Sequence, residues 1–437
     1  MTTNRVEKFQ QLYAQGIEAL ARNQDEEANR LMFEAAKTAP EGWLQMAIQL
    51  TKEGKEDLAE PRFREVLQLS KEPLVRCAAL NNLGMIYANR GQNALATGLF
   101  EEAAKTYPSI ADSHSNQGLM HLHAARFDEA LRLINRALKI DPWHEQAQFL
   151  RAMTLLQSGD YLQGFKEYEC RWRSKSNGLA KLPACVPEWD GTNGKNLYVY
   201  GEQGHGDSIL MLRYAPLIRS RGVRLTWVAQ KSLATIVAPL VDKVAVVGDE
   251  IPDFDTHIPA VSLPRIFGTT IETIPPAPYI KAESAVDFGP GFHVGIAWKG
   301  SKAQGNDKFR STKLEAWGPV LNIKGVTFHS LQVDGEEEAD TYPQIKRHPL
   351  PKDFSETANR VAGLDLIISV DTSLVHLAGA MGKPCWCALH CRPYFVFPQR
   401  LGTATPWYAS VHLFRQRAEL EWKPVFETIA KELQCLV

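Results

Sequence analysis

The sequence predicts an α plus α/β chain in which a helical solenoid is followed by two α/β domains. Small and large residues recur with a period of about 34 between residues 9 and 178, which is typical of stacked helix pairs. After residue 180, hydrophobic segments of strand length alternate with helical segments, and this alternation indicates parallel sheets. We therefore expect domains at residues 1–180, 181–285 and 286–437.

The repeat follows the spacing of a tetratricopeptide repeat, with a small residue where two helices touch, large residues between them and a proline after the second helix. One copy consists of Leu83, Gly84, Tyr87, Ala96, Phe100, Ala103 and Pro108. The next copy contains Gly118, Ala130, Ile134, Ala137 and Pro142, and an early copy contains Gly16, Ala28, Met32, Ala35 and Pro40. We expect about five helix pairs in residues 1–180.

Such pairs stack because each exposes an apolar face that only the next pair covers, and the stack forms a superhelix with a concave surface. That surface typically holds an extended peptide, so a protein or peptide is the expected partner of the repeats. A homodimer formed through the repeats and a plain spacer are the alternatives.

Composition sets limits on the surroundings of the chain. Its net charge of -1 over 437 residues gives no general attraction to nucleic acid or to anionic membranes. The N-terminus is polar, and no apolar stretch approaches the roughly 20 residues that cross a bilayer. Seven scattered cysteines do not form a disulfide pattern. We expect a cytoplasmic protein with no membrane span and no nucleic-acid partner.

The second half begins with a loop marked by Pro183 and Pro187. In the first α/β domain, strands are expected at residues 197–200, 223–229 and 244–247, with helices at 208–220 and 233–240. A proline-rich segment at 274–280 indicates an interdomain linker. In the second α/β domain, strands are expected at residues 293–298, 327–331, 366–370 and 384–388.

Two polar segments follow predicted strands. Asp371, Thr372 and Ser373 come after a strand and open a helix, where backbone N–H groups, hydroxyls and the helix dipole can hold a diphosphate. His376 lies one turn later on the same face and can donate to a phosphate or a ribose. A helix N-cap for Asp371 and a core position for His376 are the structural alternatives.

The glycine-rich turn at residues 201–207 ends at Asp207, at the edge of the sheet where ligands of open α/β folds bind. Gly204 and Gly206 of this turn are candidate nucleotide-binding positions. An N-cap is the structural alternative for Asp207.

Residues 364–384 resemble the donor motif of the heptosyltransferase-like glycosyltransferases, in particular that of bacterial tetratricopeptide proteins that carry such a domain. Residues 201–208, 213–216, 407–408 and 413–416 are similar to that group as well, in the same order. The resemblance implies a GT-B fold, in which a Rossmann-like acceptor-side domain and a Rossmann-like donor domain face each other across a cleft.

The resemblance also implies roles for single residues. Asp207 matches the general base that deprotonates the acceptor hydroxyl, with His205 as a second candidate, and Asp371 matches the acid that touches the donor sugar. Lys299 can neutralise the departing diphosphate, and Gln332 lies where the nucleotide-facing loop of the family lies. The donor is expected to be a nucleoside-diphosphate sugar, bound as a substrate without a metal or another cofactor.

Two patterns contain metal-binding residue types. Asp253 and Asp255 spell Asp-x-Asp on a short connection, and a GT-B architecture does not need a metal there. Cys385 and Cys387 alternate along a predicted strand close to His390 and Cys391, which is more typical of buried thiols than of a zinc site.

One segment departs from the family. The related proteins carry Asp-Trp-Arg-Trp shortly after the strand at residues 384–388, whereas this chain has His390, Cys391 and Arg392, so the basic residue is retained and the Asp is lost.

The sequence therefore predicts an inverting, metal-independent glycosyltransferase whose repeats recruit an acceptor, expected to be a protein. A degenerate transferase domain that serves as a protein-binding adaptor is one alternative, and the lost Asp favours it. A sugar-nucleotide epimerase or hydrolase on the same fold is the other, although a long repeat is hard to explain in an enzyme of small molecules.

Overall fold

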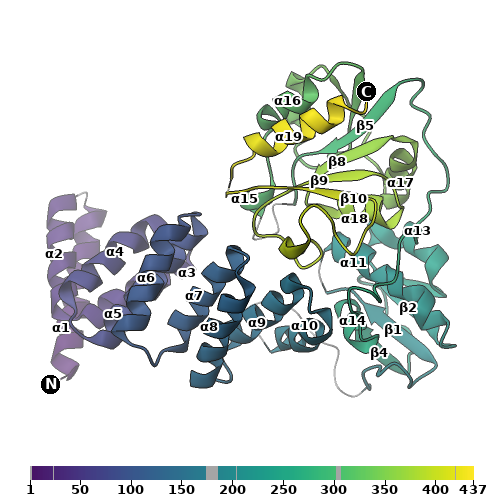
Figure 1. Ribbon diagram of the computed structural model, residues 1–437. Helices are drawn as coiled ribbons and strands as arrows, with labels where there is room; N and C mark the ends of the chain where they lie inside the picture. The colour runs from purple at the N-terminus through teal and green to yellow at the C-terminus, as the bar shows by residue number, and fades with distance from the viewer. Residues whose placement is uncertain (1, 23, 174–185, 203, 302–306, 419) are drawn as a thin grey trace. The chain divides into compact units, whose positions relative to one another are not determined.

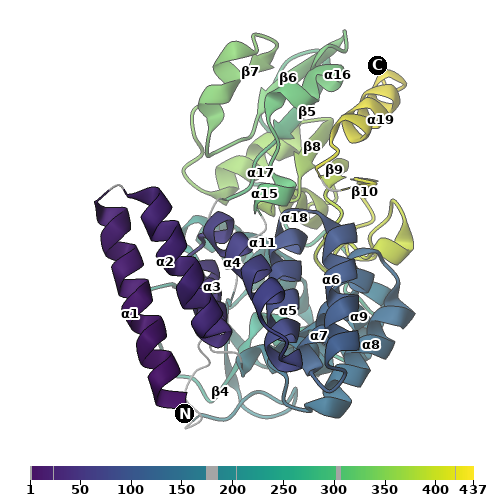
Figure 2. The same ribbon diagram turned by 90° about the vertical axis from the view of Figure 1, so that its left-hand side faces the viewer.

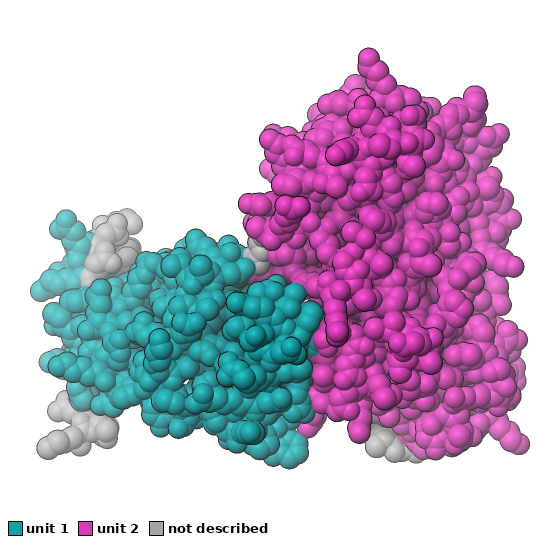
Figure 3. Space-filling model, in the orientation of Figure 1, with its two compact units in different colours: residues 1–154 teal, residues 155–437 magenta. Residues whose placement is uncertain are grey.

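The computed structural model describes residues 2–22, 24–173, 186–202, 204–301, 307–418 and 420–437 (Figure 1). The chain divides into two compact units, Met1–Thr154 and Leu155–Val437 (Figure 3). Pro183, which marked a predicted loop, lies outside the described residues.

Unit 1 is built from successive helix pairs, which Figure 2 shows side by side. Its helices are α1 (Thr2–Ala21), α2 (Asp25–Thr38), α3 (Pro40–Lys52), α4 (Glu56–Leu69), α5 (Pro73–Asn89), α6 (Asn93–Thr106), α7 (Ala111–His123), α8 (Phe127–Ile140) and the first part of α9 (Glu145–Ser158). Pro40 and Pro73 stand in the first turns of α3 and α5, where a missing backbone N–H costs no helical hydrogen bond.

The small residue of each repeat brings the two helices of a pair together. A Cβ atom at Gly84 would lie 2.5 Å from the ring of Phe100, and a Cβ atom at Gly118 would lie 2.5 Å from Cγ1 of Ile134. Contacts this short leave no room for any side chain at the two glycines. The spacing of small and large residues in the sequence therefore reports the helix packing.

Amide side chains join the first helices of successive pairs. Asn81 donates to Oγ of Ser113 at 2.9 Å, Asn116 donates to Oδ1 of Asn81 at 3.2 Å, and Gln146 donates to Oδ1 of Asn116 at 3.2 Å. These groups are buried or nearly so, and their mutual hydrogen bonds offset the cost of removing them from water.

Unit 2 begins with the rest of α9, followed by α10 (Tyr161–Glu167) and the short helix η1 (Tyr168–Trp172). These helices pack on aromatic residues from the C-terminal part of the chain. The rings of Tyr161 and Trp407 lie 5.5 Å apart, and those of Phe165 and Phe395 lie 5.2 Å apart. Helix α10 is thus part of the core of unit 2.

The first sheet of unit 2 is parallel, with the strand order β3-β2-β1-β4. Its strands are β1 (Asn196–Tyr200), β2 (Arg224–Ala229), β3 (Lys243–Val246) and β4 (Thr256–Pro259). The helices between and after them are α11 (His205–Met211), η3 (Leu212–Tyr214), α12 (Ala215–Arg219), η4 (Lys231–Leu233), α13 (Ala234–Val237), η5 (Ala238–Leu240), η6 (Ala260–Ser262) and α14 (Leu263–Ile266).

The second sheet is also parallel, with the order β10-β9-β8-β5-β6-β7. Its strands are β5 (Phe292–Ala297), β6 (Val326–Ser330), β7 (Ile345–Lys346), β8 (Leu366–Val370), β9 (Cys385–Leu389) and β10 (Val411–Arg415). The helices of this part are α15 (Asp307–Arg310), η7 (Leu314–Trp317), α16 (Gly318–Leu321), η8 (Glu336–Thr341), α17 (Phe354–Gly363), α18 (Ser373–Ala380), η9 (Gln399–Leu401) and α19 (Lys423–Gln434).

The predicted fold class is confirmed: a tetratricopeptide solenoid is followed by a GT-B-type pair of Rossmann-like α/β domains. The domain bounds expected from the sequence stay a prediction. Where one helix was expected at 208–220, the structure has α11, η3 and α12, because Pro216 lacks the N–H that a continuous helix needs. Among the described residues, no helix combines the length and the apolar character needed to cross a membrane.

Candidate functional site

The two polar segments singled out in the sequence meet inside unit 2. Helix α11 follows β1 of the first sheet, α18 follows β8 of the second sheet, and the two helices are in contact (Figure 1). A Cβ atom at Gly206 would lie 2.8 Å from Cδ2 of His376 and 3.2 Å from Nε2 of the same ring. Only a glycine permits this approach, which brings Asp207 into the electrostatic range of Asp371.

Helix α11 begins without a side-chain cap. Gly204 is its N-cap residue and has extended backbone angles, whereas Asp207 stands within the first turn. The N-cap alternative for Asp207 is therefore wrong. Backbone N–H groups of Gly204 and Asp207 form hydrogen bonds with the Asp207 carboxylate, so this side chain contributes to the start of α11 although it is not the N-cap residue.

Burial raises the pKa of Asp207 to about 7, and the negative charges of Glu202 and Asp371 act in the same direction. The backbone N–H groups of Gly204 and Asp207 oppose this rise. A carboxyl group with a pKa close to neutral is matched to proton transfer, because it is partly ionised and is also basic enough to take a proton.

Helix α18 has a side-chain cap, and it is not Asp371. The hydroxyl of Thr372 accepts from the backbone N–H of Leu374 at 3.3 Å and lies 3.1 Å from Oγ of Ser369. Ser373 is the first residue of the helix and is partly exposed. The N-cap alternative for Asp371 is wrong, and its carboxylate is left to face other groups.

Three basic side chains set the charge of Asp371. Burial alone raises its pKa, but His390, His376 and Arg310 together outweigh burial and hold the pKa below its ordinary value. Nε2 of His390 lies 3.8 Å from Oδ2 of Asp371, and Nη1 of Arg310 donates to the Asp371 carbonyl at 3.0 Å. Asp371 is therefore ionised at neutral pH.

His376 occupies a buried position and also presents one nitrogen to the partner helix. Its Nδ1 lies 3.1 Å from the Tyr408 hydroxyl, while Nε2 has no hydrogen-bond partner within the part of the chain that the structure describes. Burial lowers its pKa to about 4, assisted by the charge of Arg213 and opposed by Asp371. The ring is neutral at physiological pH and can donate or accept one hydrogen bond at Nε2.

Lys299 lies in the loop after β5, and Gln332 lies in the loop after β6. Oε1 of Gln332 accepts from the backbone N–H groups of Trp298 and Lys299, at 2.9 Å each. Its Nε2 donates to the carbonyls of Lys299 and Asp334, at 3.1 Å and 2.9 Å. All polar atoms of this amide are engaged, so Gln332 shapes the loop, and its direct contact with a nucleotide stays a prediction.

Nζ of Lys299 lies 2.5 Å from Oε2 of Glu338. A diphosphate would have to compete with this carboxylate for the ammonium group. The role of Lys299 as a diphosphate ligand therefore also stays a prediction.

His205 was the second candidate base. Its Nε2 lies 2.8 Å from the Ser232 hydroxyl, and its ring stacks on that of Phe354 at 5.3 Å between centroids. Burial lowers its pKa. These contacts hold the ring against Ser232 and Phe354, so Asp207 is the better candidate.

Several residues near the site had little or no signal in the sequence. Arg310 was not singled out as a site residue in the sequence, and its guanidinium group donates to the backbone carbonyl of Asp371. His390 had the residue type of a metal ligand, and it lies beside Asp371 instead. Glu202 and Tyr408 lie in segments that resemble the family, but their contacts with Arg171 and His376 join positions distant in the sequence and were not predicted.

The metal-like patterns have structural roles. Oδ2 of Asp255 accepts from the backbone N–H groups of Lys195 and Asn196, at 2.9 Å each. Cys385 and Cys387 are buried in β9, and burial raises their pKa values. Within the described ranges, no group of three or more His, Cys, Asp or Glu side chains is placed to hold a metal ion.

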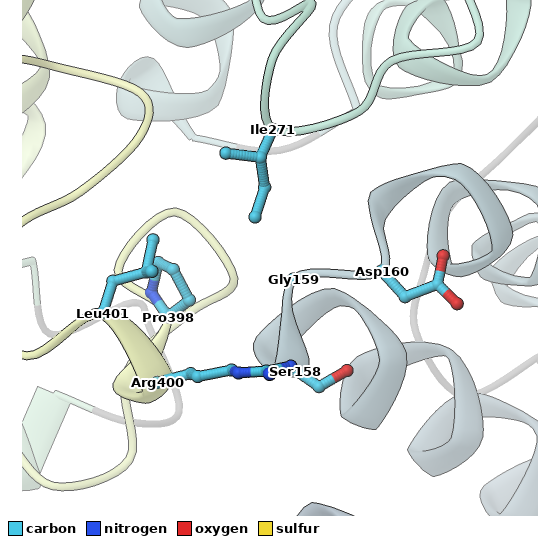
Figure 4. A pocket seen from close by; sticks show the side chains of 7 residues that line it. All are labelled: Ser158, Gly159, Asp160, Ile271, Pro398, Arg400 and Leu401. Atoms are coloured by element: carbon cyan, nitrogen blue, oxygen red, sulfur yellow. The ribbon is translucent and has the colours of Figure 1, made fainter.

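A cavity of about 300 Å³ lies elsewhere in unit 2 (Figure 4). Its lining comes from the end of α9, from the loop after α14 and from the region of η9, namely Ser158, Gly159, Asp160, Ile271, Pro398, Arg400 and Leu401. None of the predicted site residues lines this cavity, so it is not the site where α11 and α18 meet.

Comparison with models of known protein families gives no match. Among curated proteins, Protein FlbA of Caulobacter vibrioides is 25% identical over 405 residues, which cover 81% of this chain. The chain spans 66% of the length of FlbA, somewhat less than two thirds.

Two solved structures illustrate the similarity to known folds. An O-GlcNAc transferase mutant from Thermobaculum terrenum has 12% identity and a TM-score of 0.34, covering 92% of this chain and 91% of that chain. MamA from Desulfovibrio magneticus RS-1 has 21% identity and a TM-score of 0.30, covering 39% of this chain and 98% of that chain. The fold is established by the helices and sheets of the chain itself, which combine a tetratricopeptide solenoid with a GT-B-type pair of α/β domains.

Proposed function

We propose that the protein is an inverting glycosyltransferase that moves a sugar from a nucleoside diphosphate to an acceptor recruited by its repeats. The observation that carries this proposal is the contact between the first turn of α11, which bears Asp207, and α18, which bears His376 and follows Asp371. Both helices begin at the carboxyl ends of parallel strands, where ligands of open α/β sheets bind.

In the proposed reaction, Asp207 takes the proton of the acceptor hydroxyl. The acceptor oxygen attacks the anomeric carbon, the bond between that carbon and the diphosphate oxygen breaks, and the nucleoside diphosphate leaves with the bonding electrons. In-line displacement inverts the configuration of the anomeric carbon. A pKa of about 7 suits Asp207 to this step, because a normal aspartate would be a much weaker base.

The donor diphosphate is proposed to bind at the start of α18. The backbone N–H groups of that helix, Nε2 of His376 and the Ser373 hydroxyl offer donors to phosphate oxygens. Arg310 and Lys299 would supply positive charge nearby. Because Asp371 is ionised, it cannot bind phosphate, and we assign it to hydroxyl groups of the donor sugar.

The repeats are proposed to hold a protein or peptide acceptor, as stacked helix pairs commonly do. This assignment is tested with an N-terminal deletion that begins at Glu145. That boundary keeps α9, α10 and η1, whose aromatic residues are part of the core of unit 2. We expect the shortened chain to bind nucleoside diphosphates like the full chain and to lose transfer to the macromolecular acceptor.

A deletion that begins at residue 181 is the matched comparison. It removes Tyr161, Phe165 and Arg171 from the interior of unit 2 and should fail to fold. If the chain that begins at Glu145 modifies a protein acceptor at the full rate, the recruiting role of unit 1 is wrong. If that chain is monomeric whereas the full chain is dimeric, the repeats form the homodimer instead.

Thermal-shift measurements with UDP, GDP, ADP, CMP and dTDP sugars test the donor class. A ligand present at 100 times its dissociation constant should stabilise the protein by about 2.7 kcal/mol. Stabilisation by none of these nucleotides would contradict the proposal.

A protein-binding adaptor is the second candidate, and two observations favour it. Lys299 is paired with Glu338, and His390 stands where related proteins carry the Asp of Asp-Trp-Arg-Trp. An adaptor predicts that a peptide partner binds while no nucleotide sugar does. A transferase predicts that both bind and that the sugar is transferred.

A further inference from the structure

A buried ion pair joins the last segment of the repeat to the loop that leads into α11. The guanidinium group of Arg171, in η1, holds the Glu202 carboxylate at both oxygens, with Nε to Oε2 at 2.7 Å and Nη2 to Oε1 at 3.0 Å. The Glu202 side chain is fully buried and that of Arg171 is 2% exposed. A charged pair without access to water needs hydrogen bonds at every polar atom, because neither charge can be solvated.

The remaining polar atoms of the pair are indeed satisfied. Oε1 of Glu202 also accepts from the backbone N–H of Val261 at 3.2 Å. Nη2 of Arg171 donates to the Ser262 hydroxyl at 2.7 Å, and Nη1 donates to Oε1 of Glu169 at 2.8 Å. The carboxylate is therefore fixed in place from η1 on one side and from η6 on the other.

Glu202 stands two residues before Gly204, the N-cap residue of α11, and Asp207 lies in the first turn of that helix. The negative charges of Glu202 and Asp371 both raise the pKa of Asp207. Two other titratable groups are close in the fold: His376 of α18 lies against Gly206, the residue before Asp207, and the charge of Asp207 acts on Tyr394, whose hydroxyl lies 3.0 Å from that of Tyr168. Both are neutral at pH 7, since burial lowers the pKa of His376 and raises the pKa of Tyr394.

On the basis of the proposed function, we infer that Arg171 and Glu202 are positioning residues for the general base. Arg171 fixes the Glu202 carboxylate, and Glu202 holds the entry to α11 and presents a second negative charge to Asp207. Arg171, which fixes Glu202, therefore comes from η1 and not from either of the two α/β domains.

The test measures the titration of Asp207 directly, without substrate, in the full chain labelled with ¹³C at the aspartate carboxyl carbons. The Asp207 signal is assigned as the one that Asp207→Asn removes. In Glu202→Gln, Asp207 should titrate about half a pH unit or more below its wild-type value, because a like charge has been removed. Glu188→Gln is the matched control, since it removes a half-buried carboxylate that pairs with Arg265 at 2.6 Å and leaves Arg171 and Glu202 intact.

An unchanged Asp207 titration in Glu202→Gln would overturn the inference and leave a purely structural ion pair. If Glu202→Gln does not fold, the doubly neutral variant Arg171→Gln with Glu202→Gln replaces it, and Asp207 should again titrate at lower pH. An equal shift in Glu188→Gln would also overturn the inference, because the effect would then be non-specific. Failure of the proposed function has a different signature, namely full transfer activity in Asp207→Asn.

Discussion

Asp207 and Asp371 stand at equivalent places in the two α/β domains, yet their surroundings push their pKa values in opposite directions. Each follows a parallel strand and lies near the start of a helix. Asp207 lies near Glu202 and Asp371, and its pKa rises to about 7. Asp371 lies near His390, His376 and Arg310, and its pKa falls below the ordinary value.

Under the proposed function, this difference would let one residue type take two tasks at one site. A carboxyl group among negative and neutral neighbours holds a proton well and can act as a base. A carboxylate among basic neighbours stays ionised and can only accept hydrogen bonds. The environment, and not the amino acid, sets the opposite pKa shifts of Asp207 and Asp371.

The largest expected effect comes from Asp207→Asn. Removal of a general base should lower the rate of transfer by about 10²–10⁴-fold, while the affinity for the nucleoside diphosphate stays close to wild type. Steady-state kinetics and calorimetry on the same sample measure the two quantities. Asp253→Asn is the control, because Asp253 is exposed on the connection between β3 and β4. Normal turnover in Asp207→Asn would show that Asp207 is not the general base.

The variant His376→Ala tests whether the donor diphosphate binds at the start of α18. Loss of a hydrogen bond to a charged phosphate should weaken binding of the nucleoside diphosphate by about 1.5–3 kcal/mol. Lys299→Ala should have a smaller effect, because its ammonium group is shared with Glu338. His412→Ala, in β10 of the same sheet, serves as the control. Calorimetry that finds wild-type affinity in both His376→Ala and Lys299→Ala would show that the donor binds elsewhere.

The smallest expected effect is on stability and depends on pH. In the unfolded chain Asp207 ionises near pH 3.9, as aspartates ordinarily do, whereas in the folded protein its pKa is about 7. Between these values the folded state binds more protons than the unfolded state, so this group's contribution to stability falls as the pH rises through the window.

Asp207→Asn removes that contribution. The variant should be more stable than the wild type by about 1–3 kcal/mol at pH 8, with the difference vanishing near pH 4. Urea unfolding of both proteins at the two pH values measures it. The comparison isolates Asp207 from His376, whose lowered pKa gives the opposite slope in both proteins. A stability difference that does not change with pH would refute the raised pKa of Asp207.

The helix pairs of the repeat and the central strands of the sheets were predictable, because each is recognised from residues close together in the sequence. Gly84 and Phe100 report one helix contact through their spacing alone, and the apolar run of β8 was placed correctly at 366–370. Strand β4 was missed because Thr256 and His257 interrupt its apolar character, although both are buried. Its stability comes from pairing with β1, which the segment itself does not encode.

The sequence predicted which residue types form the site, but it did not predict the pKa shifts of its two carboxyl groups. The turns at Asp207 and Asp371 were visible as polar segments after strands. Their opposite pKa shifts depend on Glu202, His390 and Arg310, which reach the two carboxylates only in the folded chain. The engagement of Gln332 by four backbone groups also arises from loop geometry alone.

The placement of α10 and η1 inside unit 2 has a consequence for how such chains can vary. Because α10 and η1 share a core with Trp407 and Phe395, they belong to the folded interior of unit 2. Helix pairs can then be added, lost or exchanged on the N-terminal side of α9 without removing these aromatic contacts. A chimaera that joins a foreign repeat at Glu145 should inherit a new partner and keep the old chemistry.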